Sequence, residues 1–371
     1  MKYYIIAGEA SGDLHAANLI KALRKKDTQA EIRAWGGDLM EAAGAKLVKH
    51  YRDLAFMGFW EVITNLKTIL QNIKFCKQDI ASFNPDAIIF IDYPGFNMRI
   101  AKWAKIKGIT THYYISPQIW AWKENRIKSI KCDVDHMYVI LPFEKDFYEK
   151  KHQFPVHFVG HPLLDAVENR PSVNEAKFRK KHKLSELPII ALLPGSRKQE
   201  IAKMLQSMLA MLKYFPSYQF VIAGAPSQGD EFYMQFIKNT QVVLVKNETY
   251  DLLSISHAAL VTSGTATLET ALFQVPEVVC YKGNFISYHI AKRIVQLKYI
   301  SLVNLIMGRE VVTELIQNNF NEKRLQQELK VILETENRNR ILKDYYLLQK
   351  KLGGLGASER TADLILATTK N

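Results

Sequence analysis

Cysteine is scarce in this 371-residue chain, and its three residues, Cys76, Cys132 and Cys280, lie far apart. Because no two of them form a Cys-x-x-Cys pair, we expect neither a zinc cluster nor a disulfide framework, and the odd count is typical of a reducing cytoplasm. The chain also lacks a run of about 18 consecutive apolar residues, so we expect no transmembrane helix. Its first residues lack the extended apolar core and the cleavage site of a signal peptide.

Acidic residues are fewer than basic ones: the chain has 37 acidic and 50 basic residues, which gives a formal charge of +13. This balance favours an anionic partner, which would be a nucleic acid, a phosphorylated metabolite or an anionic membrane surface, although a charge excess also serves solubility. The length suffices for two domains, and the 48% hydrophobic content is enough to give each domain a core.

Short apolar runs alternate with amphipathic segments in both halves of the chain. We predict strands at 2–7, 32–37, 87–91, 111–115, 137–141 and 156–160, then at 189–193, 219–224, 242–245, 258–261 and 276–281. Such alternation predicts an α/β fold with two Rossmann-like, doubly wound domains. We expect a first domain at 1–165, a second at 166–345, and a helical segment at 346–371 that packs back on the first domain or on a partner subunit.

Two carboxylates follow predicted strands of the first domain. Glu9 lies in a turn that holds only Gly8 and Gly12, so the turn is no GxGxxG fingerprint and an NAD site is not favoured. A negative charge would repel a pyrophosphate there, which favours a sugar-hydroxyl or an acid/base role for Glu9. Asp92 ends a wholly apolar strand, where ligands of open α/β sheets bind. The alternative for Asp92 is a helix or turn cap.

The second domain contains two turns suited to phosphate. Residues 261–272 change from a strand to a helix at Gly264 and Thr265, and the free N–H groups at a helix N-terminus bind anions. Glu269, about one helical turn further, would accept hydrogen bonds from a pair of sugar hydroxyls. Gly195 to Arg197 form the other turn. For residues 261–272 the alternative is an ordinary strand–turn–helix connection capped by Ser or Thr.

Residues 54–75 are strongly apolar and include Phe56, Met57, Phe59 and Trp60. They are either a core helix or an interfacial helix or acyl-chain groove, with Lys67 and Lys74 facing lipid head groups. The clustered aromatic residues at one end favour the interfacial interpretation.

Tandem domains of this kind are typical of nucleotide-sugar glycosyltransferases, or of related epimerases, and we keep three hypotheses open. The first is a lipid glycosyltransferase; the second is an epimerase or glycosyltransferase with a soluble substrate, which would not need the apolar segment 54–75. The third is a non-catalytic binder of membranes or nucleic acid. Glu9 and Asp92 would repel phosphates, so we expect no nucleic-acid partner.

A series of motifs then occurs in a fixed order. They are Gly8-Glu9-Ala10-Ser11-Gly12-Asp13, Ile91-Asp92-Tyr93-Pro94-Gly95-Phe96-Asn97, Ser116-Pro117-Gln118-Ile119-Trp120-Ala121-Trp122, Leu141-Pro142-Phe143-Glu144, Gly160-His161-Pro162, Leu193-Pro194-Gly195-Ser196-Arg197, Ser263-Gly264-Thr265-Ala266-Thr267-Leu268-Glu269 and Tyr299-Ile300-Ser301-Leu302-Val303-Asn304-Leu305-Ile306. With these motifs the chain closely resembles the bacterial lipid-A-disaccharide synthase family, from residue 1 to the C-terminal helix.

The resemblance implies two domains of the GT-B type that face each other across a cleft, and an inverting, metal-independent reaction without a cofactor. The substrates would be UDP-2,3-diacylglucosamine and 2,3-diacylglucosamine 1-phosphate (lipid X). It further implies a cytoplasmic enzyme bound peripherally to the anionic inner face of the inner membrane, and in some members a homodimer that exchanges C-terminal segments.

The resemblance also assigns residues. Asp92 and Glu9 would be catalytic, with Asp92 the candidate base for the acceptor 6-hydroxyl. Many members carry a second acid where Gly95 stands here, so Gly95 favours Asp92 as the base. The expected UDP and donor site comprises Gly195, Ser196, Arg197, Ser263, Gly264, Thr265, Ala266, Glu269, Asn304 and Gln317.

Overall fold

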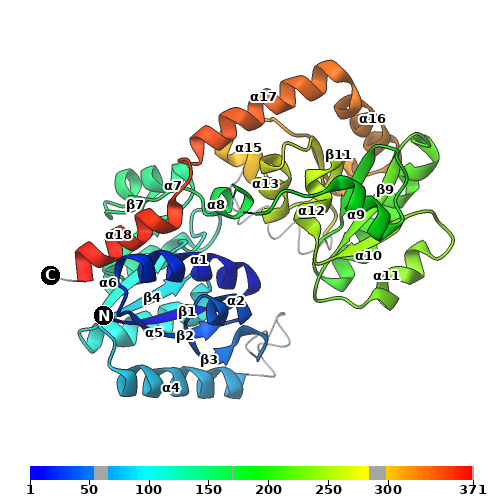
Figure 1. The fold of residues 1–371 in the computed structure, drawn as a ribbon. Helices are drawn as coiled ribbons and strands as arrows, with labels where there is room; N and C mark the ends of the chain where they lie inside the picture. The colour runs from blue at the N-terminus through cyan, green and yellow to red at the C-terminus, as the bar shows by residue number, and fades with distance from the viewer. Residues whose placement is uncertain (54–65, 169, 284–297, 370–371) are drawn as a thin grey trace. The chain divides into compact units, whose positions relative to one another are not determined.

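The chain divides into two compact units in the computed structural model, which describes residues 1–53, 66–168, 170–283 and 298–369 (Figure 1). Unit 1 contains Met1–Asp165 together with Leu352–Asn371, and unit 2 contains Ala166–Lys351. The chain therefore leaves unit 1, builds the whole of unit 2 and then returns to unit 1.

Unit 1 is built on a seven-stranded sheet of order β3-β2-β1-β4-β5-β6-β7, in which all neighbours are parallel. Its strands are β1 (Lys2–Ala7), β2 (Glu31–Gly36), β3 (Lys46–His50), β4 (Ala87–Ile91), β5 (Thr110–Tyr114), β6 (His136–Val139) and β7 (His157–Phe158). Its helices are α1 (Ala10–Lys26), α2 (Asp38–Ala42), η1 (Tyr51–Asp53), α4 (Leu66–Phe83), α5 (Pro94–Ile106), η2 (Glu124–Arg126), α6 (Ile127–Asp133), α7 (Pro142–Asp146), η3 (Phe147–Lys151) and α18 (Ala357–Thr369). Helix α8 (Leu163–Glu168) spans the boundary at Asp165.

Unit 2 has a six-stranded parallel sheet of order β10-β9-β8-β11-β12-β13. Its strands are β8 (Ile189–Leu193), β9 (Gln219–Gly224), β10 (Val243–Lys246), β11 (Ser256–Thr262), β12 (Glu277–Tyr281) and β13 (Glu314–Ile316). Its helices are α9 (Glu175–His182), α10 (Lys198–Leu209), η4 (Ala210–Tyr214), α11 (Asp230–Ile237), α12 (Thr249–Ser254), α13 (Thr265–Leu272), α15 (Leu302–Met307), η5 (Gln317–Asn319), α16 (Glu322–Leu333) and α17 (Thr335–Lys351). The prediction of two Rossmann-like, doubly wound domains is confirmed.

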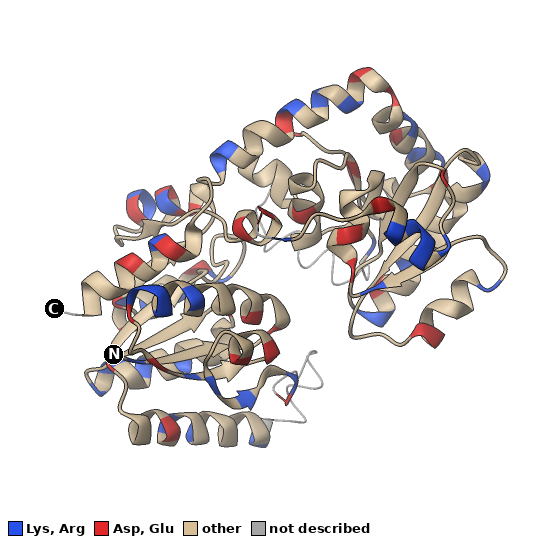
Figure 2. Ribbon diagram, in the orientation of Figure 1, with Lys and Arg blue, Asp and Glu red and all other residues tan. Residues whose placement is uncertain are grey.

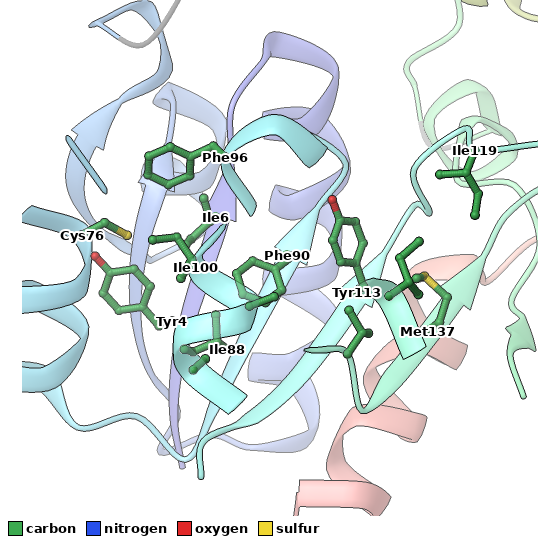
Figure 3. Close-up of a cluster of buried hydrophobic side chains, with 14 of the residues drawn as sticks. Tyr4, Ile6, Cys76, Ile88, Phe90, Phe96, Ile100, Tyr113, Ile119 and Met137 are labelled. Atoms are coloured by element: carbon green, nitrogen blue, oxygen red, sulfur yellow. The ribbon is translucent and has the colours of Figure 1, made fainter. Parts of the chain in front are cut away.

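The core of unit 1 explains why its central strands are apolar throughout. Helices cover both faces of the sheet, and all five residues of β4 are buried, as expected for a parallel strand covered on both sides. Figure 3 shows Ile6, Ile88 and Phe90 from neighbouring strands beside Phe96 and Ile100 of α5. Each such side chain contributes roughly 1.5–3 kcal/mol by leaving water, so this cluster fixes the position of the strand ends that follow it.

Each sheet contains one point where the strand order reverses. In unit 1 the chain runs outward from β1 through β2 on one side and from β4 through β5 on the other. In unit 2 it does the same from β8 through β9 and from β11 through β12. Ligands of open α/β sheets bind beyond the carboxyl ends of the strands at such a switch point. We therefore expect ligands to bind at the turns after β1, β4, β8 and β11.

Two edge strands, β3 and β13, were not predicted from the sequence. Strand β3 carries Lys46, Lys49 and His50 at a sheet edge and is only partly buried, so it lacks the apolar run that marks the other strands. Strand β13 has three residues, which is too short to show a period. Polar or short edge strands are the usual way to protect a sheet edge from pairing with other chains.

The second half of the apolar stretch 54–75 begins helix α4. Its Ile73, Cys76 and Ile80 are buried against unit 1, whereas Leu70 is 55% exposed and Phe75 is 45% exposed. Figure 2 shows Lys and Arg positions recurring along α4, where Asp79 is the one acidic residue of the helix. Phe56, Met57, Phe59 and Trp60, which we predicted to contact lipid, lie outside the described residues.

Candidate functional site

The switch point of unit 1 brings together the two predicted catalytic carboxylates. Ala7, the last residue of β1, pairs with Ile91, the last residue of β4, so both strands end at the same edge of the sheet. Glu9 is the N-cap of α1, is exposed and makes no side-chain capping bond. Asp92 is the first residue after β4. The carboxylate of Glu9 is close enough to that of Asp92 to repel its negative charge.

Asp92 has an unusual backbone that its neighbours hold in place. Asp92 and Tyr93 both lie in the left-handed region, with φ angles of 44° and 50°, which costs roughly 1–3 kcal/mol for such residues. The Asp92 carbonyl oxygen accepts hydrogen bonds from Asn97 Nδ2 at 2.7 Å and from the Tyr113 hydroxyl at 2.6 Å. Strain that several contacts maintain is typical of functional sites, which favours a functional role for Asp92 over a simple turn cap.

The environment of Asp92 keeps its carboxyl group poised for proton transfer. Burial, followed by repulsion from Glu9, raises the pKa of Asp92 from 3.8 to about 6, and the Tyr93 N–H partly opposes the shift. A carboxylate with a pKa near 6 is mostly ionised at neutral pH and is a stronger base than an ordinary aspartate. General bases are most effective when their pKa lies near the working pH. The position and the pKa of Asp92 both suit such a base.

Two glycines of the unit 1 motifs have different structural roles. A Cβ atom at Gly8 would lie 2.3 Å from the Tyr93 ring, so any side chain there would displace the residue that follows Asp92. At Gly95 no atom lies within 4 Å of an added Cβ. The backbone at position 95 therefore has room for the Cβ of a second acid.

Two other carboxylates of the motifs stabilise the loops around this edge. Asp13 is buried and accepts backbone N–H groups at the start of α2, at 2.8–3.2 Å. Glu144 is buried and accepts hydrogen bonds from the Ser116 hydroxyl at 2.6 Å and from the Trp120 indole at 3.1 Å. Glu144 also accepts the nearby N–H groups of Ile140 and Leu141. Sequence reasoning missed both roles, because the partners in other loops, at residues 37–40 and at Ser116 and Trp120, are distant in the chain.

One Asp-x-Asp triplet, Asp133-Val134-Asp135, lies at the opposite end of the sheet, before β6. Asp135 accepts hydrogen bonds from the Thr111 backbone N–H at 3.0 Å and hydroxyl at 2.9 Å, and it forms an ion pair with Lys105. This triplet therefore joins β5 to β6. Within the described parts of the chain, no group of three or more His, Cys, Asp or Glu side chains is arranged to hold a metal ion.

The switch point of unit 2 contains the turn at Gly264. Gly264 is the N-cap of α13 and has a φ angle of 151°, which side-chain-bearing residues rarely adopt. Gly264 and Thr265 are exposed and Ala266 is half-buried, so the start of this helix is open to a ligand. Since first-turn N–H groups of a helix have no acceptor within the helix, this turn is suited to binding an anion.

A buried network holds the segment before α15 against this turn. The Ser263 hydroxyl donates to the Ile300 carbonyl at 3.0 Å, and Glu314 accepts the N–H groups of Ile300 and Ser301, each at 2.9 Å. Asn304 is fully buried, and its amide binds Glu314 together with the backbone of residues 311 and 312. Ser263 and Asn304, both predicted to contact the donor, have these side-chain groups engaged within the protein.

Gln317 and Asn304 were both predicted to belong to the donor site, but their side chains differ in hydrogen bonding. It lies in the left-handed region with a φ angle of 53°, directly after β13. Its side-chain nitrogen is buried and has no hydrogen-bond partner among the described residues. A buried donor without a partner costs free energy, so Gln317 has a group that a ligand would satisfy.

The turn at Gly195 lies after β8, on the other side of the same switch point. Arg197, the N-cap of α10, is exposed. Glu200 Oε2 accepts the Ser196 N–H at 3.2 Å, and a Cβ at Gly195 would lie 2.3 Å from the same oxygen. An anion that bound to this N–H would have to replace the Glu200 carboxylate. The Gly264 turn is therefore the more open of the two.

Glu269 lies one turn into α13, with its carboxylate beside Tyr250. The Tyr250 hydroxyl donates to Glu269 Oε1 at 2.9 Å. Burial raises the pKa of Glu269 above its ordinary value, and this hydrogen bond partly opposes the shift. Sequence reasoning placed Glu269 but did not find Tyr250, which lies on a different helix, α12.

Proteins of similar sequence cover nearly the entire chain. The family model described as Lipid-A-disaccharide synthetase matches residues 3–367. A lipid-A-disaccharide synthase from Syntrophus aciditrophicus is 39% identical over 99% of this chain and 97% of the relative. One from Geobacter metallireducens is 37% identical over 98% of this chain and 96% of the relative.

Solved structures with the same fold are far more distant in sequence. A UDP-GlcNAc 2-epimerase from Neisseria meningitidis bound to UDP-GlcNAc aligns with a TM-score of 0.68 at 13% identity and covers 100% of both chains. The Methanocaldococcus jannaschii UDP-GlcNAc 2-epimerase in complex with UDP-GlcNAc and UDP also aligns with a TM-score of 0.68 at 13% identity, over 99% of this chain and 100% of that chain. These likenesses show the fold, whereas the sequence matches place the chain more narrowly: it belongs to the lipid-A-disaccharide synthetase family.

Proposed function

We propose that this chain transfers 2,3-diacylglucosamine from UDP-2,3-diacylglucosamine to lipid X with inversion at the anomeric carbon. The products would be the β-1′,6-linked lipid A disaccharide 1-phosphate and UDP. Family membership makes the chain a glycosyltransferase. The observation that carries the residue assignment is the pair of switch points, because one presents carboxylates and the other presents an open helix N-terminus.

Asp92 is the general base of the proposed reaction. Its carboxylate takes the proton of the acceptor 6-hydroxyl as that oxygen attacks the anomeric carbon of the donor. The bond from the anomeric carbon to the diphosphate oxygen breaks, and the electron pair leaves with UDP. Attack on the side opposite to the leaving group inverts the configuration. Glu9 keeps the Asp92 carboxyl basic through like-charge repulsion.

Unit 2 stabilises the leaving group. The N-terminus of α13, at Gly264, Thr265 and Ala266, carries a partial positive charge that favours the diphosphate. Arg197 adds a full positive charge, and Glu269 accepts hydrogen bonds from the ribose hydroxyls. Gln317 supplies a free N–H donor. Asn304 and Ser263 act by holding the segment around Ile300 in place. No metal ion or cofactor takes part in this proposal.

The test is a transfer assay with UDP-2,3-diacylglucosamine and lipid X, in which released UDP and the disaccharide are both measured, with and without a chelator. We expect UDP release only when both substrates are present, and no effect of the chelator. Conversion of UDP-GlcNAc to its 2-epimer, without transfer, would favour the epimerase alternative. Transfer of a soluble sugar at an equal rate would favour a glycosyltransferase with a soluble acceptor.

We further propose that unit 1 binds peripherally to the anionic inner face of the inner membrane. The exposed Leu70 and Phe75 of α4, with Lys67 and Lys74 on the same helix, support this proposal because interfacial helices combine apolar and basic residues. No helix in the described ranges is long and apolar enough to cross a membrane. Replacing Phe56, Phe59 and Trp60 with Ser, or Leu70 with Ser, should reduce sedimentation with anionic vesicles.

The matched control for the vesicle experiment is the replacement of Leu187 and Met234 with Ser. These residues are 41% and 47% exposed in unit 2, so their loss removes exposed apolar side chains away from unit 1. Equal loss of sedimentation in both sets would contradict a membrane face on unit 1. A homodimer that exchanges segment 346–371 remains part of the proposal, and light scattering of the purified chain tests it.

A further inference from the structure

Tyr250 is fixed beside the predicted ribose-binding carboxylate of unit 2. It lies on α12, and its hydroxyl donates to Glu269 Oε1 at 2.9 Å. Its ring packs against Phe273, the residue that ends α13, with a centroid distance of 5.2 Å. Glu269 and Phe273 lie one helical turn apart, so Tyr250 contacts the same face of α13 at two points.

Arg170, near the start of unit 2, binds the backbone of Tyr250. One guanidinium nitrogen donates to the Tyr250 carbonyl at 2.7 Å, and another donates to Asp251 Oδ1 at 2.6 Å. The guanidinium also lies over the Phe273 ring, 4.9 Å from its centroid. Arg170 therefore joins the backbone of α12 to the end of α13, and it leaves the Tyr250 hydroxyl little freedom to turn away from Glu269.

The hydrogen bond from Tyr250 restricts the orientation of the Glu269 carboxylate. A carboxylate has two oxygens with about four acceptor positions. With Oε1 engaged by Tyr250, the orientation of the carboxylate plane is restricted, and Oε2 and the remaining acceptor position on Oε1 are left for a ligand. Two vicinal hydroxyls require acceptors in such a fixed arrangement. Without the phenol, the carboxylate would rotate about its last torsion, which is broad for Glu.

We propose that Tyr250 is a positioning residue, which orients Glu269 to accept hydrogen bonds from the ribose hydroxyls of UDP and is itself anchored by Arg170. This inference rests on the proposed function, because it takes the ribose to bind at Glu269. Tyr250 does not touch the reacting atoms. It acts on nucleotide affinity through Glu269, so its effect requires the ribose hydroxyls.

The experiment compares UDP with 2′,3′-dideoxy-UDP by titration calorimetry, in the wild-type chain and in Tyr250→Phe. The variant keeps the ring that packs on Phe273 and removes only the hydroxyl. We expect it to weaken UDP binding by about tenfold, the usual scale for a hydrogen bond to a charged group. We expect the affinity for the dideoxy nucleotide to be the same in both proteins.

Tyr214→Phe is the matched control, because Tyr214 also donates to a glutamate, Glu322, at 2.6 Å in unit 2. It should change neither affinity. In the Glu269→Gln background, Tyr250→Phe should add no further loss, since coupled residues are not additive. Equal weakening of both nucleotides by Tyr250→Phe, or no change in UDP affinity, would overturn the positioning role.

The outcome also separates this inference from the proposed function. If wild-type protein binds UDP more tightly than the dideoxy nucleotide and Tyr250→Phe keeps the full difference, the inference fails and the ribose site stands. If wild-type protein does not distinguish the two nucleotides, the assignment of Glu269 to ribose fails, and the role of Tyr250 fails with it.

Discussion

The two units carry very different residues after the two strands that flank the switch point, which are β1 and β4 in unit 1 and β8 and β11 in unit 2. Unit 1 ends these strands with Glu9 and Asp92, whereas unit 2 ends them with the turns that contain Gly195 and Gly264. The residues with positive φ angles beside the switch point are Asp92 and Tyr93 in unit 1, and the glycines Gly195 and Gly264 in unit 2. One sheet plan thus yields a carboxyl group of raised pKa in unit 1 and an open helix N-terminus in unit 2. The two units therefore differ in the two short turns at each switch point, whereas the sheet and helices that support these turns follow the same plan.

The largest effect is expected from Asp92→Asn, which removes the base and keeps the shape. Turnover should fall by at least ~100-fold, the usual scale for losing a general base, while UDP affinity should stay the same, because UDP is assigned to unit 2. Steady-state kinetics and calorimetry measure the two quantities. The control is Asp86→Asn at the other end of β4, where the carboxylate accepts the Lys2 N–H. Turnover near the wild-type value in Asp92→Asn would remove Asp92 from the base role.

Gly264→Ala tests the other side of the comparison. Nothing lies within 4 Å of the added Cβ, so the substitution acts through the φ angle of 151°. We expect UDP affinity to fall about tenfold, because strain of roughly 1–3 kcal/mol moves the first N–H groups of α13. Gly229→Ala is the control, since Gly229 caps α11 with a φ angle of −71° and equally open surroundings. A similar loss in both variants would contradict a special role for the Gly264 turn.

A smaller effect concerns pH. Asp92 must be ionised to act as a base, and its pKa is raised to about 6, so kcat/KM should fall as pH drops through about 6. Glu9→Gln removes the repulsion that contributes to the raised pKa of Asp92. The acidic limb of the kcat/KM–pH profile should therefore move to lower pH. The limb should not reach the ordinary value of 3.8, because burial is the larger cause. An unchanged acidic limb in Glu9→Gln would show that Glu9 does not contribute to the raised pKa of Asp92.

The smallest effect is expected from Gly95→Asp, which adds a second acid to the Asp92 motif. An added Cβ meets no atom within 4 Å, and an acidic residue is tolerated in the first turn of a helix. Turnover should stay within about twofold of wild type. The double variant with Asp92→Asn should remain as slow as Asp92→Asn alone. Recovery in the double variant would show that position 95 can supply the base.

The sequence was informative where local pattern and local geometry coincide. Apolar runs identified β4 and β11, and the residues that end them led directly to Asp92 and Gly264. The polar edge strand β3 and the three-residue β13 lack that pattern. The roles of Asp13, Glu144 and Tyr250 depend on partners 19 or more residues away. Such contacts arise from packing, which no local pattern encodes.

The return of the chain to unit 1 has a consequence for synthesis on the ribosome. Helix α18 packs against α1, and its Ala357, Ala362 and Ile365 are buried. Domains usually fold as units, N-terminal first, while the chain emerges. Here the helix that covers α1 is translated only after all of unit 2. We therefore expect the face of α1 that α18 covers to stay exposed until α18 has been synthesised. Unit 1 is thus completed last, although its synthesis begins first.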